Sequence, residues 1–196
     1  MRIALALIAT AATFAVTPAF ADACVDEIKA AMGKAMTSGP MKMESTIVGG
    51  GTNMTMNGEI VPPANMHANV VTNGQAIEMT VLDGKAWMNM AGAWMELPAD
   101  AAAQMTAGFN MANTDAMDAM TEPQCLGTTN VDGKDVLSYA WKLDVEGNAT
   151  ANRAYVDPAI GAPVHMETDV TTQGVTTNVV VKYTYDPSVT ITAPAM

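Results

Sequence analysis

The sequence is poor in the residue types on which catalytic and nucleic-acid-binding sites depend. It has two His, two Cys and only 5% aromatic residues, and its 9 Lys and Arg face 20 Asp and Glu, a net charge of −11 at pH 7. Neither His lies near a candidate nucleophile, zinc-ligand clusters are absent, and Gly49-Gly50-Gly51 lies between predicted strands rather than in a phosphate-binding loop. These absences argue against an enzyme and indicate no cofactor. The negative charge argues against nucleic acid and anionic membrane surfaces as partners.

The N-terminus has the features of an export signal. Arg2 precedes an apolar run over residues 3–16, and Ala19-Phe20-Ala21 has the small-x-small pattern of a signal peptidase site. We therefore expect a signal peptide over residues 1–21, cleavage after Ala21, and a single periplasmic domain over residues 22–196. A retained membrane anchor is the alternative, but the run is short for a spanning helix. No later segment approaches 18 continuous apolar residues, so we expect no stable membrane insertion.

Only one disulfide pairing is open to the two cysteines. Cys24 and Cys125 are not spaced as a redox CxxC motif, and export would place them in an oxidising compartment. We expect them to form a structural disulfide. A lipid anchor on Cys24 is the alternative, although Asp22 fits poorly before a lipidated cysteine.

Methionine replaces leucine as the main aliphatic side chain. The chain contains 18 Met, but only five Leu follow residue 21. Met is flexible and polarisable, so a Met-rich interior loses packing specificity and gains adaptability.

The hydrophobic periodicity predicts helices at two places and strands elsewhere. Apolar residues recur at helical spacing over 22–37 and again over 98–122, where Gly108 and residues 113–115 suggest a break into two helices. Between and after these regions the period is two, as in half-buried strands, and the segments with this period are 41–48, 54–60, 66–70, 77–81, 85–90, 93–97, 137–143, 151–156, 164–170, 175–183 and a last short strand over 189–192. Turn dipeptides such as Asn73-Gly74 and Asp83-Gly84 separate them, which predicts antiparallel hairpins.

Three stretches of sequence resemble the outer-membrane lipoprotein carrier (LolA-like) superfamily. Residues 83–87 and 92–98, which read DGKAW and GAWMELP, are similar to a hairpin that precedes the helices of that superfamily. Residues 155–164, YVDPAIGAPV, resemble another of its hairpins, and residues 183–194 resemble its closing strand.

The resemblance implies an α+β fold. We expect a curved antiparallel sheet of about 10–11 strands that forms an unclosed half-barrel, with an N-terminal helix and a mid-chain helical lid on the concave face. Members bind a lipid, an acyl chain or a lipoprotein between sheet and helices. The carrier itself has an Arg on an early strand that bonds to the lid. Here residues 41–48 contain Lys42 and no Arg, and Arg153 is the only Arg after the signal segment, which puts lipoprotein transport by that latch in doubt.

We expect a Met-rich apolar cavity to bind the ligand. Met pairs two apart, such as Met54 and Met56, share one face of a strand. The candidate lining residues are Met36, Met43, Met54, Met56, Met79, Met88, Met105, Phe109, Met117, Trp141 and Met166.

Three alternatives stay open from the residues. The same methionines could form an ordinary core, with Met in place of Leu. Thioethers also favour Cu(I), so a periplasmic copper-binding protein is possible, although no metal site is assigned. In that case His67 and His165 would each face away from the adjacent Met, because neighbouring strand residues point to opposite faces. Finally, the fold could serve as an envelope sensor or interaction module with envelope proteins as partners.

Overall fold

The computed structural model describes residues 18–108, 114–145 and 148–195. Two α-helices, α1 (Pro18–Ala35) and α2 (Ala99–Gly108), and one short 3-10 helix, η1 (Thr114–Ala119), accompany a single sheet. The strands are β1 (Met41–Gly49), β2 (Thr52–Val61), β3 (Asn65–Thr72), β4 (Gln75–Leu82), β5 (Lys85–Met90), β6 (Ala93–Glu96), β7 (Thr121–Val131), β8 (Lys134–Val145), β9 (Asn148–Asp157), β10 (Ala162–Thr172) and β11 (Val175–Tyr185).

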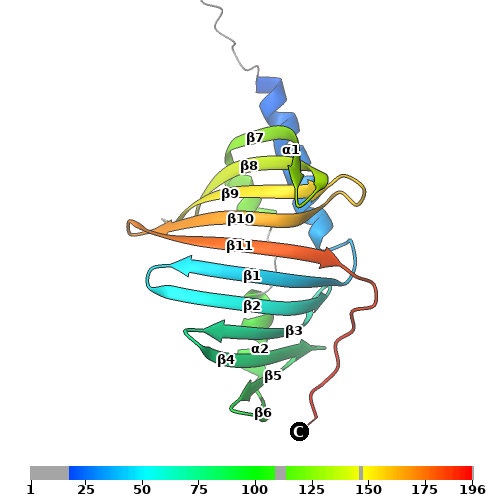
Figure 1. The fold of residues 1–196 in the computed structure, drawn as a ribbon, viewed down its shortest axis with the longest axis vertical. Coiled ribbons are helices and arrows are strands. Elements are labelled where there is room, and N and C mark those ends of the chain that lie inside the picture. The colour runs from blue at the N-terminus through cyan, green and yellow to red at the C-terminus, as the bar shows by residue number, and fades with distance from the viewer. Residues whose placement is uncertain (1–17, 109–113, 146–147, 196) are drawn as a thin grey trace, which may run out of the picture.

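The 11 strands form two meanders joined at their first and last strands. The order across the sheet is β6-β5-β4-β3-β2-β1-β11-β10-β9-β8-β7, and each pair of neighbours is antiparallel (Figure 1). β6 and β7 lie at opposite edges, so the sheet stays open. The expected unclosed half-barrel is confirmed.

The predicted hairpin turns are present. Asn73 and Gly74 have φ of 49° and 83°, and Asp83 and Gly84 have φ of 51° and 79°. Two successive positive φ values are those of a type I′ turn, whose twist matches that of the flanking strands. These turns fix the register of each hairpin and therefore decide which side chains face the helices.

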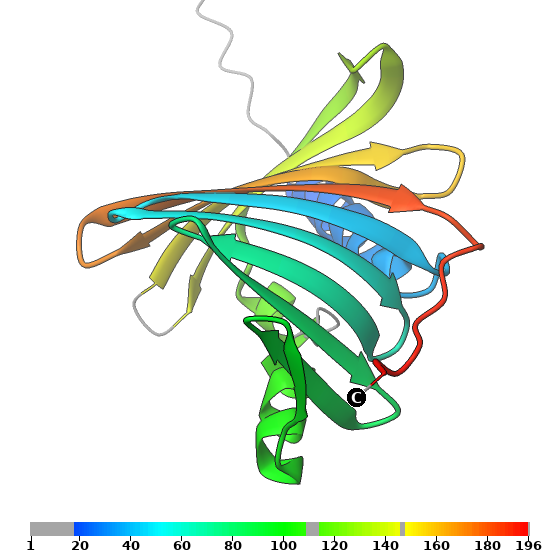
Figure 2. The ribbon, with the colours of Figure 1, turned by 60° about the horizontal axis from the view of Figure 1, so that its bottom comes forward.

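Both helices cover the concave face of the sheet (Figure 2). α1 packs mainly on β10 and β7, and α2 on β5 and β4. Each helix has its own core cluster. Ile28 and Ala31 of α1 pack with Tyr139, Trp141 and neighbouring residues, whereas Ala102 of α2 belongs to a cluster with Met41, Met43, Met66 and Val81.

The predicted disulfide is confirmed. Cys24 on α1 and Cys125 on β7 are bonded across a sequence separation of 101 residues, with their Cα atoms 5.7 Å apart. Cys24 itself is buried in the α1 cluster. The bond therefore fastens the N-terminal helix to one edge of the sheet.

The boundaries differ from the sequence-based expectation in three places. α1 begins at Pro18 and ends at Ala35, and the expected helical region over 98–122 gives way to strand β7 at Thr121. Residues 189–192 are not a strand: the chain after β11 is an extended tail without ladder pairing. Tail residues Thr190 and Ile191 lie beside His67 and Thr80, on the side of the sheet opposite the helices. The tail therefore packs on the face of the sheet and does not extend it at an edge.

The expected signal segment falls mostly outside the described residues, which begin at residue 18. Among the described residues, no helix combines the length and hydrophobicity needed to cross a membrane.

Candidate functional site

An apolar cavity lies on the concave face of the sheet, between its middle strands and the end of α1. Its volume is about 250 Å³. A cavity of roughly 150 Å³ with apolar walls already accepts benzene, so this space is large enough for a guest. The lining residues are Met36, Met43, Ser45, Ile47, Met56, Ile60, Pro63, Ala64, Asn65, Met66, Val179, Val181 and Tyr183.

The strand register explains why these side chains meet. Met43 on β1 is opposite Gly58 on β2 and Tyr183 on β11, and Ser45 is opposite Met56 and Val181. Directly opposed residues share one face, so these residues form a continuous patch across three strands. A Cβ at Gly58 would meet Met43 Cε at an ordinary contact distance of 3.6 Å but would lie only 3.3 Å from the backbone oxygen of His67, so the close approach to β3 is what favours glycine here.

The rim of the cavity comes from two segments that are not part of the sheet ladder. Met36 lies just beyond the C-terminal end of α1, and Pro63 and Ala64 belong to the connection between β2 and β3. Because α1 is held by the disulfide and by its own core cluster, its end is positioned over the cavity.

Tyr183 and Ser45 are the buried hydroxyl side chains of the cavity. Each is 5% exposed. Burial raises the pKa of Tyr183 far above its ordinary value, and the neighbouring phenol of Tyr185 adds to the effect, so Tyr183 is a neutral hydrogen-bond donor at physiological pH. Asn65 also lines the cavity, but its side-chain oxygen accepts a hydrogen bond from the backbone N–H of Asp83 at 3.0 Å.

Three of the predicted ligand-binding residues line this cavity: Met36, Met43 and Met56. Met79, Met105 and Met166 pack beside the first core cluster, Met117 and Trp141 belong to the α1 cluster, and Met88 is half-buried opposite Met79. Met54 lies opposite Ile47 at the far end of β2, outside the lining, and Phe109 falls outside the described residues. The other described candidates are thus core or flanking residues.

The sequence-based prediction missed the whole β11 wall of the cavity. Val179, Val181 and Tyr183 alternate along β11 and face the cavity. The alternation of apolar and polar residues predicts that these three side chains share one face of a strand. Only the pairing of β11 with β1 brings that face beside Met43 and Ser45.

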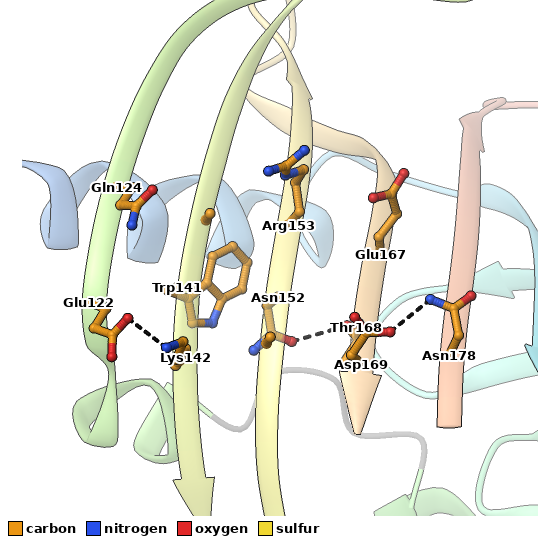
Figure 3. Close-up of a pocket in the computed structure, with 12 residues that line it drawn as sticks. Glu122, Gln124, Trp141, Lys142, Asn152, Arg153, Glu167, Thr168, Asp169 and Asn178 are labelled. Atoms are coloured by element: carbon orange, nitrogen blue, oxygen red, sulfur yellow. Dashed lines mark hydrogen bonds and ion pairs between the residues drawn. The ribbon is translucent and has the colours of Figure 1, made fainter. Parts of the chain in front are cut away.

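A second hollow, of about 260 Å³, lies over β7 to β11 and is lined mainly by polar and charged residues (Figure 3). Three pairs of its side chains are bonded to each other: Lys142 with Glu122 at 2.7 Å, Thr168 with Asn152 at 3.0 Å, and Asn178 with Asp169 at 3.0 Å. Arg153 and Glu167 also line it. Most of its residues alternate with those that face α1, so it opens on the other side of the sheet. Its charged and polar residues suit an alkyl chain less well than the aliphatic and thioether side chains of the first cavity.

The placement of the histidines bears on the copper alternative. His67 pairs with Glu78 at 3.0 Å, and the His165 ring lies 5.1 Å from the Tyr155 ring, whereas Met66 and Met166 belong to or pack against the core on the concave side. The described residues contain no group of three or more His, Cys, Asp or Glu side chains that could hold a metal ion. A site made of thioethers alone stays a prediction.

Fold and cavity together define a class: an open antiparallel half-barrel whose helices leave an apolar cavity against the sheet. Solved structures share this fold. The chain is similar to the lipoprotein LppX from Mycobacterium tuberculosis, with a TM-score of 0.64 and 13% identity over 83% of this chain and 94% of the other. It is also similar to LprF from Mycobacterium bovis, with a TM-score of 0.63 and 13% identity over 89% of this chain and 98% of the other.

A chain of the MucA/MucB complex from Pseudomonas aeruginosa shows the same likeness at a lower level. The TM-score is 0.50 with 11% identity, and the match covers 85% of this chain but only 59% of that one. No known protein family matches the sequence. No curated protein matches it either. The resemblance drawn from the sequence therefore holds for the fold.

Proposed function

We propose that this protein binds the alkyl or acyl chain of a lipid or lipoprotein in the apolar cavity at the C-terminal end of α1, and that it works as a carrier or binding protein rather than an enzyme. The observation that supports this most directly is the cavity itself, whose lining is aliphatic and thioether except for Ser45, Asn65 and Tyr183. The likeness to the lipoprotein LppX agrees with this assignment.

The size of the cavity indicates how the ligand is held. If each methylene takes about the volume of a water molecule, ~30 Å³, the 250 Å³ accommodates roughly eight of them. At about 0.8 kcal/mol for each buried methylene, the gain is about 6 kcal/mol before the cost of association. A gain of about 6 kcal/mol corresponds to a dissociation constant of about 40 μM before the cost of association, so the buried segment alone binds more weakly than that, which suits a protein that must release its ligand.

The remainder of a longer chain would leave the cavity at its rim. Met36 and the connection at Pro63 and Ala64 contribute no ladder hydrogen bonds, so they can move without breaking the sheet. Met36 can also change rotamer to fit different chains, because an unbranched thioether adapts at low cost.

Filling the cavity from one wall tests the proposal. Val179 lines the cavity, and its neighbour Val180 points to the other side of β11. Val179→Phe should reduce binding of a fluorescent dodecanoyl probe at least tenfold, and Val180→Phe, the matched control, should leave it unchanged. Native mass spectrometry of the purified protein provides a second measurement. Equal affinities for the two variants, or no probe binding by the wild type, would contradict the proposal.

A second candidate function is binding of an envelope protein, supported by the fold likeness to a chain of the MucA/MucB complex. Cross-linking of the exported protein in its own envelope tests it. A specific cross-link that persists in the Val179→Phe variant would favour a protein partner over a lipid.

We further infer that the chain is exported and cleaved after Ala21. The sequence pattern and the disulfide support this, because disulfides persist in oxidising compartments. N-terminal sequencing of the protein from the periplasmic fraction should begin at Asp22.

A further inference from the structure

Two hydroxyl groups lie in a cavity that is otherwise almost free of hydrogen-bonding side chains. Ser45 on β1 is opposite Val181 on β11, and Tyr183 lies two residues further along β11, opposite Met43. The two residues are therefore diagonal neighbours on one face, a separation that an aromatic side chain can span. Both line the cavity, and both are 5% exposed.

These hydroxyls lack partners that comparable groups have. Tyr139 donates a hydrogen bond to Glu27 at 3.3 Å, and Tyr185, two residues from Tyr183, donates one to the backbone oxygen of Pro163 at 3.1 Å. In the described part of the chain, the hydroxyls of Tyr183 and Ser45 make no such bond. The buried side-chain atoms without a partner in the described residues are Trp141 Nε1 and the two ring nitrogens of His165, so the Ser45 and Tyr183 hydroxyls stay accessible to solvent through the cavity. A ligand that fills the cavity and expels this water must offer an acceptor to the two hydroxyls or lose affinity.

The surroundings restrict the charge of that ligand atom. Among the residues that the structure describes, no Lys, Arg or His lines the cavity, and the whole chain carries a net charge of −11. A carboxylate placed here would lose its hydration without gaining a cation, which is strongly unfavourable. An uncharged oxygen can accept both O–H groups with no such penalty.

We propose that Ser45 and Tyr183 both donate hydrogen bonds to one uncharged carbonyl oxygen of the ligand, so that the cavity selects an acyl ester or amide over a hydrocarbon or a free fatty acid. This inference rests on the proposed function, because it names the ligand chemistry of the same cavity. It also makes the two hydroxyls the specificity-determining groups, whereas the methionines supply the apolar surface around the chain.

The test compares three ligands on the full exported protein: an ester and a hydrocarbon with the same number of chain atoms, and the carboxylate with the same acyl chain as the ester. Methyl dodecanoate, tetradecane and dodecanoate are each titrated against a bound fluorescent hydrocarbon probe, and the displacement of the probe gives their affinities. We expect methyl dodecanoate to bind about tenfold more tightly than tetradecane, because the hydrocarbon leaves both hydroxyls unpaired. Dodecanoate should bind more weakly than the ester at neutral pH.

Conservative variants assign the preference to the two residues. Tyr183→Phe and Ser45→Ala should each bring the ester-to-tetradecane affinity ratio toward one without weakening tetradecane binding. Tyr185→Phe is the matched control, since its hydroxyl already bonds to Pro163, and it should keep the wild-type ratio. Thermal melting identifies any variant that fails to fold, in which case the remaining variant decides.

The outcomes separate this inference from the proposed function. If tetradecane and methyl dodecanoate bind the wild type equally, or if Tyr183→Phe keeps the wild-type ratio, the hydroxyl pair is not a recognition element, although the cavity still binds chains. If none of the ligands displaces the probe, the proposed function fails and this inference fails with it.

Discussion

Removing the disulfide should destabilise the protein more than replacing two other buried side chains of similar volume with Ala. Cys24→Ala with Cys125→Ala deletes the link between α1 and β7 and leaves no unpaired thiol. Cys24 is buried in a cluster with Ile28, Ala31 and Tyr139, and Ala at this position keeps most of that contact. The effect should therefore come mainly from the lost cross-link.

The length of the closed loop sets the magnitude. For a sequence separation of 101 residues, the chain-entropy relation gives about 4.7 kcal/mol at 25 °C. Residual structure in the unfolded chain reduces such values, so we expect a loss of about 3–5 kcal/mol in the free energy of unfolding.

Urea denaturation, followed by tryptophan fluorescence without reductant, measures this loss. With a slope of about 2 kcal/mol/M, the midpoint should fall by roughly 2 M. The wild type with added reductant should approach the double variant. A midpoint shift below about 0.5 M, with an unchanged slope, would refute the claim that this cross-link stabilises the fold.

Other features of the structure give smaller, separate predictions. Burial raises the pKa of Tyr185 to about 12, above its ordinary value of 10.0, so its contribution to stability is complete below pH 10 and is lost as the pH rises towards 12; alkaline denaturation should be less steep in Tyr185→Phe, and an unchanged slope would contradict this. The Ser188 hydroxyl and backbone N–H, followed by Lys42, hold the pKa of Asp186 below its usual range; Ser188→Ala should raise it in an NMR titration. Val189 is buried on the C-terminal tail, so Val189→Ala should lower the free energy of unfolding by about 1–2 kcal/mol in thermal denaturation. An unchanged stability would mean that this side chain does not anchor the tail.

Local features of the fold could be predicted because they depend on neighbours in sequence. The dipeptides Asn73-Gly74 and Asp83-Gly84 tolerate positive φ, and the alternating residues on either side show which face is buried. The disulfide could be predicted because only one pairing exists. The open sheet with helices on its concave face was predicted only from the resemblance to the LolA-like superfamily.

The cavity could not be located in the same way, because its walls come from opposite ends of the chain. Met54 and Met56 follow the same alternation, yet only Met56 lines the cavity, although Met54 lies directly opposite the lining residue Ile47. Likewise, Tyr183 reaches Met43 only through the pairing of β1 with β11, which hydrophobic periodicity does not reveal. The tail over 189–192 has the composition of a strand but no neighbour with which to pair.

The cavity exists because two helices share one sheet without meeting over its middle. α1 covers β10 and β7, and α2 covers β5 and β4, so β1, β2 and β11 are covered mainly by side chains from the helix ends and loops. Met166 packs against both core clusters, and the cavity is lined by members of the first cluster, among them Met43, Met66 and Tyr183. A core with one centre would close such a space with branched aliphatic side chains. Here the sheet curves, the helices stand apart, and flexible methionines face the gap, an arrangement that keeps room for a guest without weakening either cluster.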